Sequence, residues 1–197
     1  MSKRIYGLIG FPVKHSLSSY MHNAAFAALD IDAQYELFEV APDNLNKFFS
    51  QTIPQRGICG FNVTIPHKEA VLGYVNAKLP AAVELIGAAN TIKVEEGSKI
   101  SCCNTDSQGF LRTLEELGFV VQDKKVVILG AGGAAKAVGI KLAQQGAARI
   151  LIYDVDSKKA GSLATKIKAS FKLESESVDS IEKLEIKSSD GNVFPSL

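Results

Sequence analysis

The stretch from Lys124 to Ala137 constrains the fold more than any other, because it joins a strand pattern to a helix pattern through a run of glycines. Val126 to Leu129 is a short, fully apolar and mostly β-branched run, which is typical of a strand covered on both faces of a parallel sheet. A helix-like pattern begins directly after it. Between the two, Gly130 to Ala135 fits the pattern G-x-G-x-x-[G/A]. The sequence therefore predicts a strand, a tight turn and a helix in immediate succession.

Each small residue of this turn has a physical reason. Gly130 permits the tight turn, Gly132 lets a pyrophosphate approach the backbone, and Ala135 lets the helix pack closely on the strand. The free N–H groups at the start of the helix are suited to hold phosphate oxygens. We expect the cofactor-binding residues of the turn to be Gly130, Ala131, Gly132, Gly133 and Ala134.

The residues that follow strengthen the interpretation, because a lone glycine fingerprint also occurs for purely steric reasons. Arg149 to Tyr153 reads as the next strand, and it ends at Asp154, which lies 24 residues after Gly130. A carboxylate that binds the ribose of a dinucleotide is expected roughly 20 residues after the glycines. The order of strand, glycines, helix, strand and acid favours a nucleotide-binding turn over a structural one.

Composition limits the remaining function classes. The chain has 197 residues, enough for one large or two small domains, and a net charge of +1. Near-neutral charge without a basic stripe gives no footprint for nucleic acid or an anionic membrane, and no apolar run approaches the roughly 20 residues that span a bilayer. The three cysteines show no metal-ligand spacing with the histidines, so we expect no metal and reduced thiols in a cytoplasmic protein.

The first part of the chain opens with a strand pattern at Ile5 to Gly10, followed by two serines at the start of a helix pattern. Ser16 or Ser18 is suited to cap that helix, since a serine oxygen accepts an orphan backbone N–H. Two hydroxyls two residues apart, beside free N–H groups, are also suited to hold a ligand carboxylate or hydroxyl. The residues alone favour the cap.

A second informative stretch runs from Gly60 to Lys68. Its alternating apolar residues predict a strand, and Pro66 then suits the first turn of a following helix. Asn62, Thr64 and Lys68 should gather at the carboxyl end of the strand, where α/β sheets bind ligands. A lysine in a first helical turn is disfavoured by the helix dipole, which lowers its pKa and suits a general acid/base. The alternative is an ordinary solvated lysine.

The next residues predict a hairpin with arms at Gly87 to Val94 and Lys99 to Cys103. Asn90 begins one arm, and Asn104-Thr105-Asp106 follows the other, where Thr105 is suited to cap a helix that stops at Gly118. We place the domain boundary after Asp106, with a first domain at 1–106 and a nucleotide domain at 107–197. Ser157 to Ile167 predicts a second crossover helix, and only a short strand and a weak helix at Ile181 to Leu184 follow Phe171.

Taken together, the motifs resemble the shikimate/quinate 5-dehydrogenase family. The resemblance covers Ile5 to about Ala164 in the family's order and is carried by His15-Ser16-Leu17-Ser18 with His22-Asn23, Gly60 to Lys68, Gly87-Ala88-Ala89-Asn90-Thr91, Asn104-Thr105-Asp106 with Gly109-Phe110, and Gly130 to Ala134. It implies an α/β fold with an N-terminal substrate domain followed by a Rossmann NAD(P)-binding domain and the active site in the cleft between them.

The resemblance also implies an activity and a set of site residues. The activity is the reversible NAD(P)-dependent reduction of 3-dehydroshikimate to shikimate, a step of the chorismate pathway to the aromatic amino acids. Lys68 is then the residue that manages the proton, and Asp106 orients the alcohol. Ser16 and Ser18 bind the substrate carboxylate, while Thr64, Asn90 and Asp106 bind its hydroxyls. This agrees with the chemistry, because oxidation of a secondary alcohol needs a base on oxygen and an acceptor over carbon.

Two departures from the family's pattern concern single positions. Ser19 stands where the family usually has Pro, which leaves the turn less rigid. Members that use NADP carry Asn-Arg-Thr after the second Rossmann strand, whereas this chain has Asp154-Val155-Asp156. Because Asp hydrogen-bonds a free ribose diol and repels a 2′-phosphate, we predict a preference for NAD, with NADP possible.

A third departure is the length of the second domain. The family continues with an Asn-Ala-Thr-x-x-Gly-Met segment and a late helix with a substrate-binding Gln, and neither is found here. We therefore expect a C-terminally truncated chain with an incomplete Rossmann domain. The competing hypotheses are a ligand-binding remnant without turnover and a different two-domain dehydrogenase of the methylene-tetrahydrofolate type. Shikimate against quinate, and monomer against homodimer, stay open.

Overall fold

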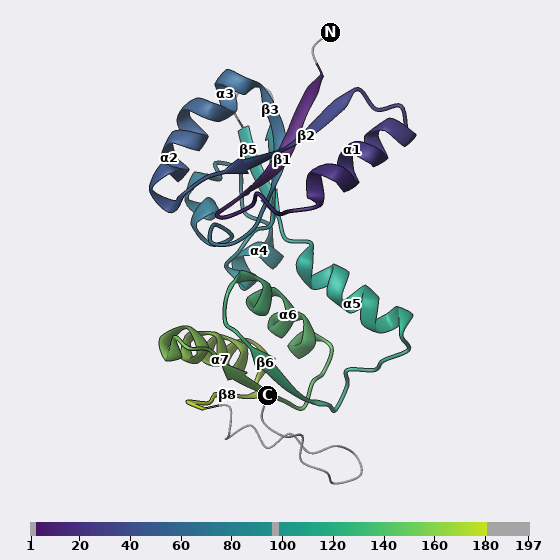
Figure 1. The fold of residues 1–197 in the computed structure, drawn as a ribbon. Coiled ribbons are helices and arrows are strands. Elements are labelled where there is room, and N and C mark those ends of the chain that lie inside the picture. The colour runs from purple at the N-terminus through teal and green to yellow at the C-terminus, as the bar shows by residue number, and fades with distance from the viewer. Residues whose placement is uncertain (1–2, 96–98, 181–197) are drawn as a thin grey trace. The chain divides into compact units, whose positions relative to one another are not determined.

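The computed structural model describes residues 3–95 and 99–180 of the chain (Figure 1). It divides into two compact units, Met1–Thr105 and Asp106–Leu197, so the division lies one residue before the expected boundary. Both units are α/β, and both contain parallel strands, as the sequence predicts. Among the described residues, none of the helices has both the length and the apolar character needed to cross a membrane.

The first unit is built on a mixed sheet with the order β2-β1-β3-β4-β5 among the described residues. Strands β1, β2 and β3 are parallel, and β4 and β5 form the predicted antiparallel hairpin. The strands span Arg4–Gly10, Ala33–Glu39, Ile58–Val63, Thr91–Glu95 and Lys99–Cys103. Since β1 and β3 run parallel side by side, the loops that follow them leave the same edge of the sheet.

Helices cover both faces of this sheet (Figure 1). One face packs on a helical segment made of η1 (Pro42–Asn44), α2 (Leu45–Lys47), the π-helix η2 (Phe48–Thr52) and α3 (Ile53–Arg56). Its core contains Phe48, Phe49 and Phe61 in edge-to-face contacts. On the other face, α1 (Ser18–Ala28) lies over Tyr35 and Leu8.

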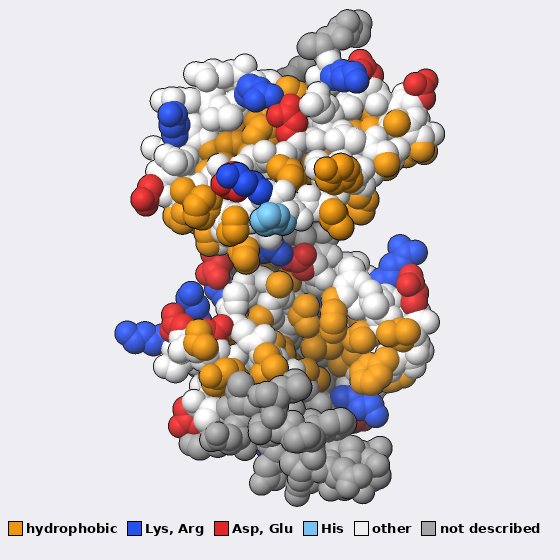
Figure 2. Space-filling view, viewed as in Figure 1, with side chains coloured by type: hydrophobic (Ala, Val, Ile, Leu, Met, Phe, Trp, Pro, Cys, Tyr) orange, Lys and Arg blue, Asp and Glu red, His pale blue; other side chains and the backbone are white. Residues whose placement is uncertain are grey.

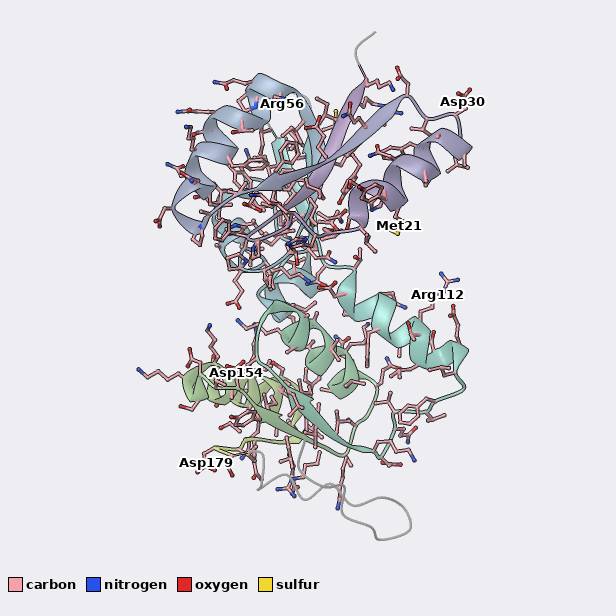
Figure 3. All side chains as sticks on the ribbon, in the orientation of Figure 1. Met21, Asp30, Arg56, Arg112, Asp154 and Asp179 are labelled. Carbon is pink, nitrogen blue, oxygen red and sulfur yellow. The ribbon has the colours of Figure 1, made fainter. Side chains whose placement is uncertain are left out.

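Two apolar side chains whose helical spacing predicts helix α1, Met21 and Leu29, face solvent rather than the sheet. Met21 is 62% exposed (Figure 3), and Leu29, just beyond the helix, is 69% exposed. The side chains that turn toward the sheet are instead His22, Asn23 and Phe26, which contact Tyr35 or Tyr6. The helix is therefore held on the sheet by an amide and aromatic rings more than by aliphatic packing.

The segment after β3 differs from the prediction. Pro66 does not open an α-helix, because residues 65–69 form turns that lead into a short 3-10 helix, η3 (Ala70–Tyr74). Gly73 and the β-branched Val71 and Val75 have low helix propensity, which accounts for the missing α-helix. The prediction that Lys68 lies in the first turn of an α-helix is wrong. The next α-helix is α4 (Ala81–Ile86), and Gly87 ends it with a φ of 73°.

The second unit contains a parallel sheet with the order β6-β7-β8 among the described residues. Helix α5 (Asp106–Glu116) comes first and ends before Gly118, whose φ of 67° suits glycine, as predicted. The remaining elements alternate in the βαβαβ order of a Rossmann half: β6 (Lys125–Leu129), α6 (Gly133–Gln144), β7 (Arg149–Tyr153), α7 (Ser157–Phe171) and β8 (Glu174–Ser177).

Helix α6 packs closely on the sheet at Gly139, whereas Ala135, at which the sequence predicted close packing, is half-buried. A Cβ at Gly139 would lie 3.1 Å from Ile128 Cδ1 in β6 and 3.2 Å from Ile167 Cδ1 in α7. Helix α6 is therefore wedged between strand β6 and helix α7, and this position must be small for the three elements to meet.

Strand β6 is less buried than its apolar sequence predicts. Leu129 is 60% exposed, and Val126 and Val127 are only half-buried. The reason is that β6 pairs with β7 on one side only among the described strands. Figure 2 shows further hydrophobic side chains on the surface of this unit, where Leu117, Phe119 and Val120 are all at least half exposed. The weak helix predicted at 181–184 lies outside the described residues.

Candidate functional site

Two serine hydroxyls meet at the start of helix α1, of which Ser18 is the first residue. Ser16 Oγ donates to Ser18 Oγ at 3.0 Å, and Ser16 Oγ also accepts the backbone N–H of Ser18 at 3.2 Å. Ser16 therefore satisfies one N–H at the helix start, although the N-cap residue itself, Leu17, has no side-chain cap bond. Both serines are half-buried. The structure thus shows Ser16 as a local N–H acceptor beside a second hydroxyl, and the ligand-binding role of the pair stays a prediction.

Thr64 lies at the carboxyl ends of β1 and β3. Its backbone N–H donates to Ile9 O at 2.9 Å, and its methyl group packs against Gly10 so closely that a Cβ there would collide with it. Val63 N donates to Asn90 O at 2.8 Å, which brings the Asn90 segment to the same edge. Thr64 and Asn90 are therefore close in space at the edge of the sheet where parallel α/β strands bind ligands.

Lys68 is carried by a turn that two contacts fix in place. Its carbonyl oxygen accepts the N–H of Ala89 at 2.8 Å. The neighbouring His67 is 1% exposed, and its Nε2 lies 2.6 Å from Val40 O. Because a carbonyl only accepts, His67 Nε2 carries the proton in this contact. The half-buried Lys68 is thus held beside the segment that contains Asn90, without the helix that the sequence predicted.

Asn90 is 9% exposed, and its carboxamide is tightly bonded. Its Oδ1 accepts the hydroxyl of Thr91 at 3.0 Å and the backbone N–H of Thr105 at 3.0 Å, while its Nδ2 donates to Thr105 Oγ1 at 2.9 Å. The Thr105 side chain, which the sequence suggested as a helix cap, is therefore bonded to Asn90. Asp106 follows as the first residue of α5, where an acid is favoured by the helix dipole.

The glycine turn of the second unit has the geometry expected for phosphate binding. Gly130 has a φ of 105°, which favours glycine, and its N–H donates to Tyr153 O at 2.7 Å. A Cβ at Gly132 would meet no atom within 4 Å, so packing does not explain a glycine there. Gly132 is also the N-cap of α6 and makes no side-chain cap bond. The space beside the Gly132 Cα is thus open, at the start of a helix whose first N–H groups suit an anion.

Asp154 follows β7 and is labelled in Figure 3. Its Oδ2 accepts the N–H of Ala131 at 2.6 Å, and its Oδ1 accepts the N–H of Asp156 at 2.8 Å. The backbone N–H groups of Asp156 and Ala131 hold the pKa of this carboxyl below its usual range. The acid predicted to bind ribose therefore lies directly beside the glycine turn and is ionised at neutral pH.

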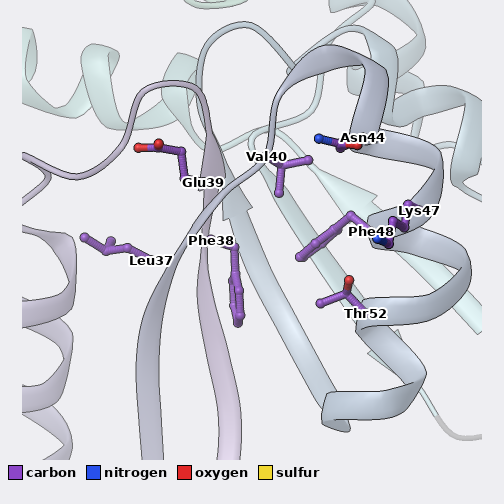
Figure 4. Close-up of a pocket in the computed structure, with 8 residues that line it drawn as sticks. All are labelled: Leu37, Phe38, Glu39, Val40, Asn44, Lys47, Phe48 and Thr52. Carbon is purple, nitrogen blue, oxygen red and sulfur yellow. The ribbon is translucent and has the colours of Figure 1, made fainter.

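Two hollows in the first unit are not lined by Ser16, Ser18, Thr64, Lys68 or Asn90. The one in Figure 4, about 290 Å³, lies between β2 and the helical segment and is lined by Phe38, Val40, Phe48 and Thr52 among others. A larger one of about 590 Å³ opens on the α1 side of the sheet, next to Tyr35, Asn62 and Thr91. Within the described ranges, no group of three His, Cys, Asp or Glu side chains could hold a metal ion.

Sequence reasoning missed the structural importance of three residues, two in the first unit and one in the second. His67, Tyr35 and Gly139 read only as members of a turn, a strand and a helix. A buried polar side chain in an apolar setting was the available signal for His67 and Tyr35, since such groups need hydrogen-bond partners. Gly139 stood inside a helix pattern, where glycine usually has a packing reason.

The two units define an α/β protein with a Rossmann-type nucleotide-binding turn. Residues 8–92 match the family model described as the shikimate dehydrogenase substrate binding domain. The chain is 42% identical over 182 residues to shikimate dehydrogenase (NADP(+)) of Caldanaerobacter subterraneus subsp. tengcongensis, which covers 91% of this chain and 64% of that protein. It is 48% identical over 165 residues to the enzyme of that name from Methanopyrus kandleri, covering 83% and 56%.

A solved structure agrees with these relatives. Shikimate 5-dehydrogenase from Listeria monocytogenes, in complex with shikimate and NAD, matches with a TM-score of 0.77 and 35% identity over 89% of this chain and 61% of that one. The chain thus spans less than two thirds of the length of these relatives. It belongs to the shikimate dehydrogenase family.

Proposed function

We propose that this chain carries the shikimate-binding and cofactor-binding residues of an NAD(P)-dependent shikimate dehydrogenase, which interconverts 3-dehydroshikimate and shikimate on the route to chorismate and the aromatic amino acids. The observation that carries the proposal is the Ser16–Ser18 hydroxyl pair at 3.0 Å, in a unit whose strand ends also hold Thr64 and Asn90. Relatives that align with this part of the chain are named for the same activity.

In this proposal the first unit binds the substrate by its polar groups. When substrate binds, the Ser16 hydroxyl turns its one proton from Ser18 Oγ to the carboxylate, to which Ser18 also donates. Thr64 and Asn90 bind ring hydroxyls. Hydrogen bonds to a charged carboxylate are stronger than those between neutral groups, about 1.5–3 kcal/mol each, so the serine pair supplies much of the affinity. Quinate differs from shikimate in its ring substituents and is the alternative substrate.

Lys68 and Asp106 are the proposed catalytic pair. Oxidation of a secondary alcohol removes a proton from oxygen and a hydride from carbon. Lys68 accepts the proton of the reacting hydroxyl through its Nζ, and the carboxylate of Asp106 accepts a hydrogen bond that orients that hydroxyl. A nicotinamide dinucleotide, when bound, supplies the hydride acceptor.

The glycine turn, Gly130 to Ala134, is the proposed phosphate-binding site, and Asp154 is the proposed ribose-binding residue. Both oxygens of Asp154 already accept a backbone N–H, yet each keeps lone-pair capacity for a ribose hydroxyl. The negative charge beside the turn opposes a 2′-phosphate, which favours NAD. The curated relatives are named for NADP(+), whereas the Listeria monocytogenes structure holds NAD. The preference for NAD therefore rests on Asp154 and its neighbours.

Steady-state turnover tests the proposal. Reduction of NAD, and separately of NADP, is followed at the nicotinamide absorbance with shikimate and then with quinate. We expect turnover by the wild type and a loss of at least about 100-fold in kcat for Lys68→Ala, as for removal of a general acid/base. Lys78→Ala, which removes an exposed lysine of the same unit, is the matched control. Shikimate binding without turnover would contradict the catalytic part and favour a ligand-binding remnant.

A further inference from the structure

Asn90 is connected to Tyr35 on strand β2 by a chain of side-chain hydrogen bonds. Tyr35 Oη donates to Asn62 Oδ1 at 2.8 Å, Asn62 Nδ2 donates to Thr91 Oγ1 at 3.2 Å, and Thr91 Oγ1 donates to Asn90 Oδ1 at 3.0 Å. Every link has its donor on the Tyr35 side. These hydrogen bonds therefore all run in one direction, and the first donor is the Tyr35 hydroxyl.

The Tyr35 hydroxyl is a dependable donor. Tyr35 is 4% exposed, and burial raises its pKa to about 12, so the phenol keeps its proton throughout the neutral range. Only the oxygen of the Asn62 carboxamide can accept that proton, and the Asn62 amide nitrogen must then face Thr91. A single hydroxyl thus decides between the two orientations of the Asn62 side chain.

Helix α1 holds Tyr35 in position from two sides. The Asn23 side chain donates through Nδ2 to Tyr35 O at 2.9 Å and accepts Tyr35 N–H through Oδ1 at 2.8 Å. The His22 ring stacks on the Tyr35 ring with a centroid distance of 4.3 Å and an interplanar angle of 18°. His22 and Asn23 therefore fix the backbone and the ring that place the hydroxyl against Asn62.

The series of hydrogen bonds ends at the carboxamide of Asn90, which is also hydrogen-bonded to Thr105. Asn90 Oδ1 accepts Thr105 N–H, and Asn90 Nδ2 donates to Thr105 Oγ1. The donor from Thr91 and the donor from Thr105 both require the Asn90 oxygen where it is. A reversal of the Asn62 amide would turn its oxygen toward Thr91, and the Thr91 hydroxyl would then donate to Asn62 instead of Asn90. Asn90 would lose that support, and its carboxamide could reorient.

We propose that Tyr35 is a positioning residue of the substrate site, whose hydroxyl fixes the orientation of the Asn90 carboxamide through Asn62 and Thr91. This rests on the proposed function in one respect, namely that Asn90 contacts the substrate. It also gives His22 and Asn23 a role, since they hold Tyr35 and have no proposed contact with the reacting groups.

The test compares Tyr35→Phe with Tyr6→Phe in the full chain. Phe keeps the ring that stacks on His22 and removes only the hydroxyl. Tyr6 lies on the adjacent strand β1 and packs on Phe26, and within the described residues its hydroxyl takes no part in the chain. The first readout is the side-chain amide signal of Asn90 in an NMR spectrum of asparagine-labelled protein. The second is the Kd of shikimate by calorimetry.

We expect Tyr35→Phe, but not Tyr6→Phe, to shift or broaden the Asn90 amide signal and to weaken shikimate binding roughly three- to tenfold, the effect of one lost neutral hydrogen bond. Thr91→Val breaks the next link and should reproduce both changes, whereas Thr91→Ser keeps the hydroxyl and should restore them. The Thr91 pair carries the test if Tyr35→Phe does not fold.

An Asn90 signal and a shikimate Kd in Tyr35→Phe and Thr91→Val that equal those of Tyr6→Phe would overturn the proposal. If the Asn90 signal changes in both variants but the wild type binds no shikimate, the positioning of Asn90 stands and the proposed function fails. The two ideas can thus be separated by the same set of proteins.

Discussion

Asp154 Oδ2 accepts the backbone N–H of Ala131 at 2.6 Å, which joins the end of strand β7 to the glycine turn that follows β6. The same carboxylate accepts the N–H of Asp156 at the start of α7. The side chain proposed to bind the ribose is thus hydrogen-bonded to the turn proposed to bind phosphate. This double bonding leads to a prediction about pH and one about the cofactor.

The stability of the second unit should depend on pH through Asp154. Backbone N–H donors lower the pKa of its carboxyl, so its contribution is complete above the unfolded value, about 3.9, and is lost as the pH falls through the lower folded value. We expect Asp154→Asn to unfold at a lower temperature than the wild type at neutral pH and the difference to shrink below about pH 4. Scanning calorimetry from neutral pH to below pH 4 measures this difference in melting temperature.

The control for this prediction is Glu115→Gln, which changes an exposed acid on α5 of the same unit. Its melting temperature should follow that of the wild type at every pH. If the difference in melting temperature between Asp154→Asn and the wild type stays constant to below pH 4, the carboxylate of Asp154 is not responsible for it.

Cofactor choice should change with the residues at the end of β7. Replacing Asp154 by Asn and Val155 by Arg removes a charge that repels a 2′-phosphate and adds one that binds it. We expect the ratio of kcat/KM for NAD to that for NADP to fall at least about tenfold, the effect of one charge-assisted hydrogen bond. Val155→Ala, at a position that is 92% exposed, should leave the ratio unchanged. An equal ratio in the double variant and the wild type would refute the role of Asp154.

Two glycines of the second unit should respond in opposite ways to a side chain. Gly132→Ala adds a methyl group where no atom lies within 4 Å, so the melting temperature should hold while cofactor binding weakens. Gly139→Val forces bulk against Ile128 and Ile167 and should cost about 1–3 kcal/mol of stability without changing the Kd of the folded protein. Titration of NAD by fluorescence and thermal unfolding separate the two. Unchanged cofactor binding in Gly132→Ala would contradict phosphate binding at this turn.

Much of the fold could be predicted from local patterns. The apolar run before Gly130, the helix between Asp106 and Gly118 and the hairpin around Asn90 were all predicted, because each depends on periodicity and turn residues within a short stretch. The position of Ser16 and Ser18 at a helix start was predicted for the same reason, and their ligand-binding role stays a prediction.

The failures have two physical causes, local helix propensity for Lys68 and tertiary contacts for Leu129 and Tyr35. Lys68 was placed on a helix because proline suits a first turn, but Gly73 and the β-branched residues around it do not sustain an α-helix. Leu129 was expected to be buried, but β6 has one strand neighbour among the described residues. Tyr35 could not be recognised, because its partners Asn23 and Asn62 come from other elements.

The measurement that tests the central claim most directly is a calorimetric titration of shikimate into the wild type, Ser16→Ala and Ser50→Ala. Ser16 contributes one hydroxyl of the proposed carboxylate site, whereas Ser50 is an exposed serine that donates to Asn46 O elsewhere in the same unit. We predict saturable binding of one shikimate by the wild type and Ser50→Ala, and a Kd at least about tenfold higher for Ser16→Ala. No binding by the wild type, or equal affinities for the two serine variants, would contradict the account.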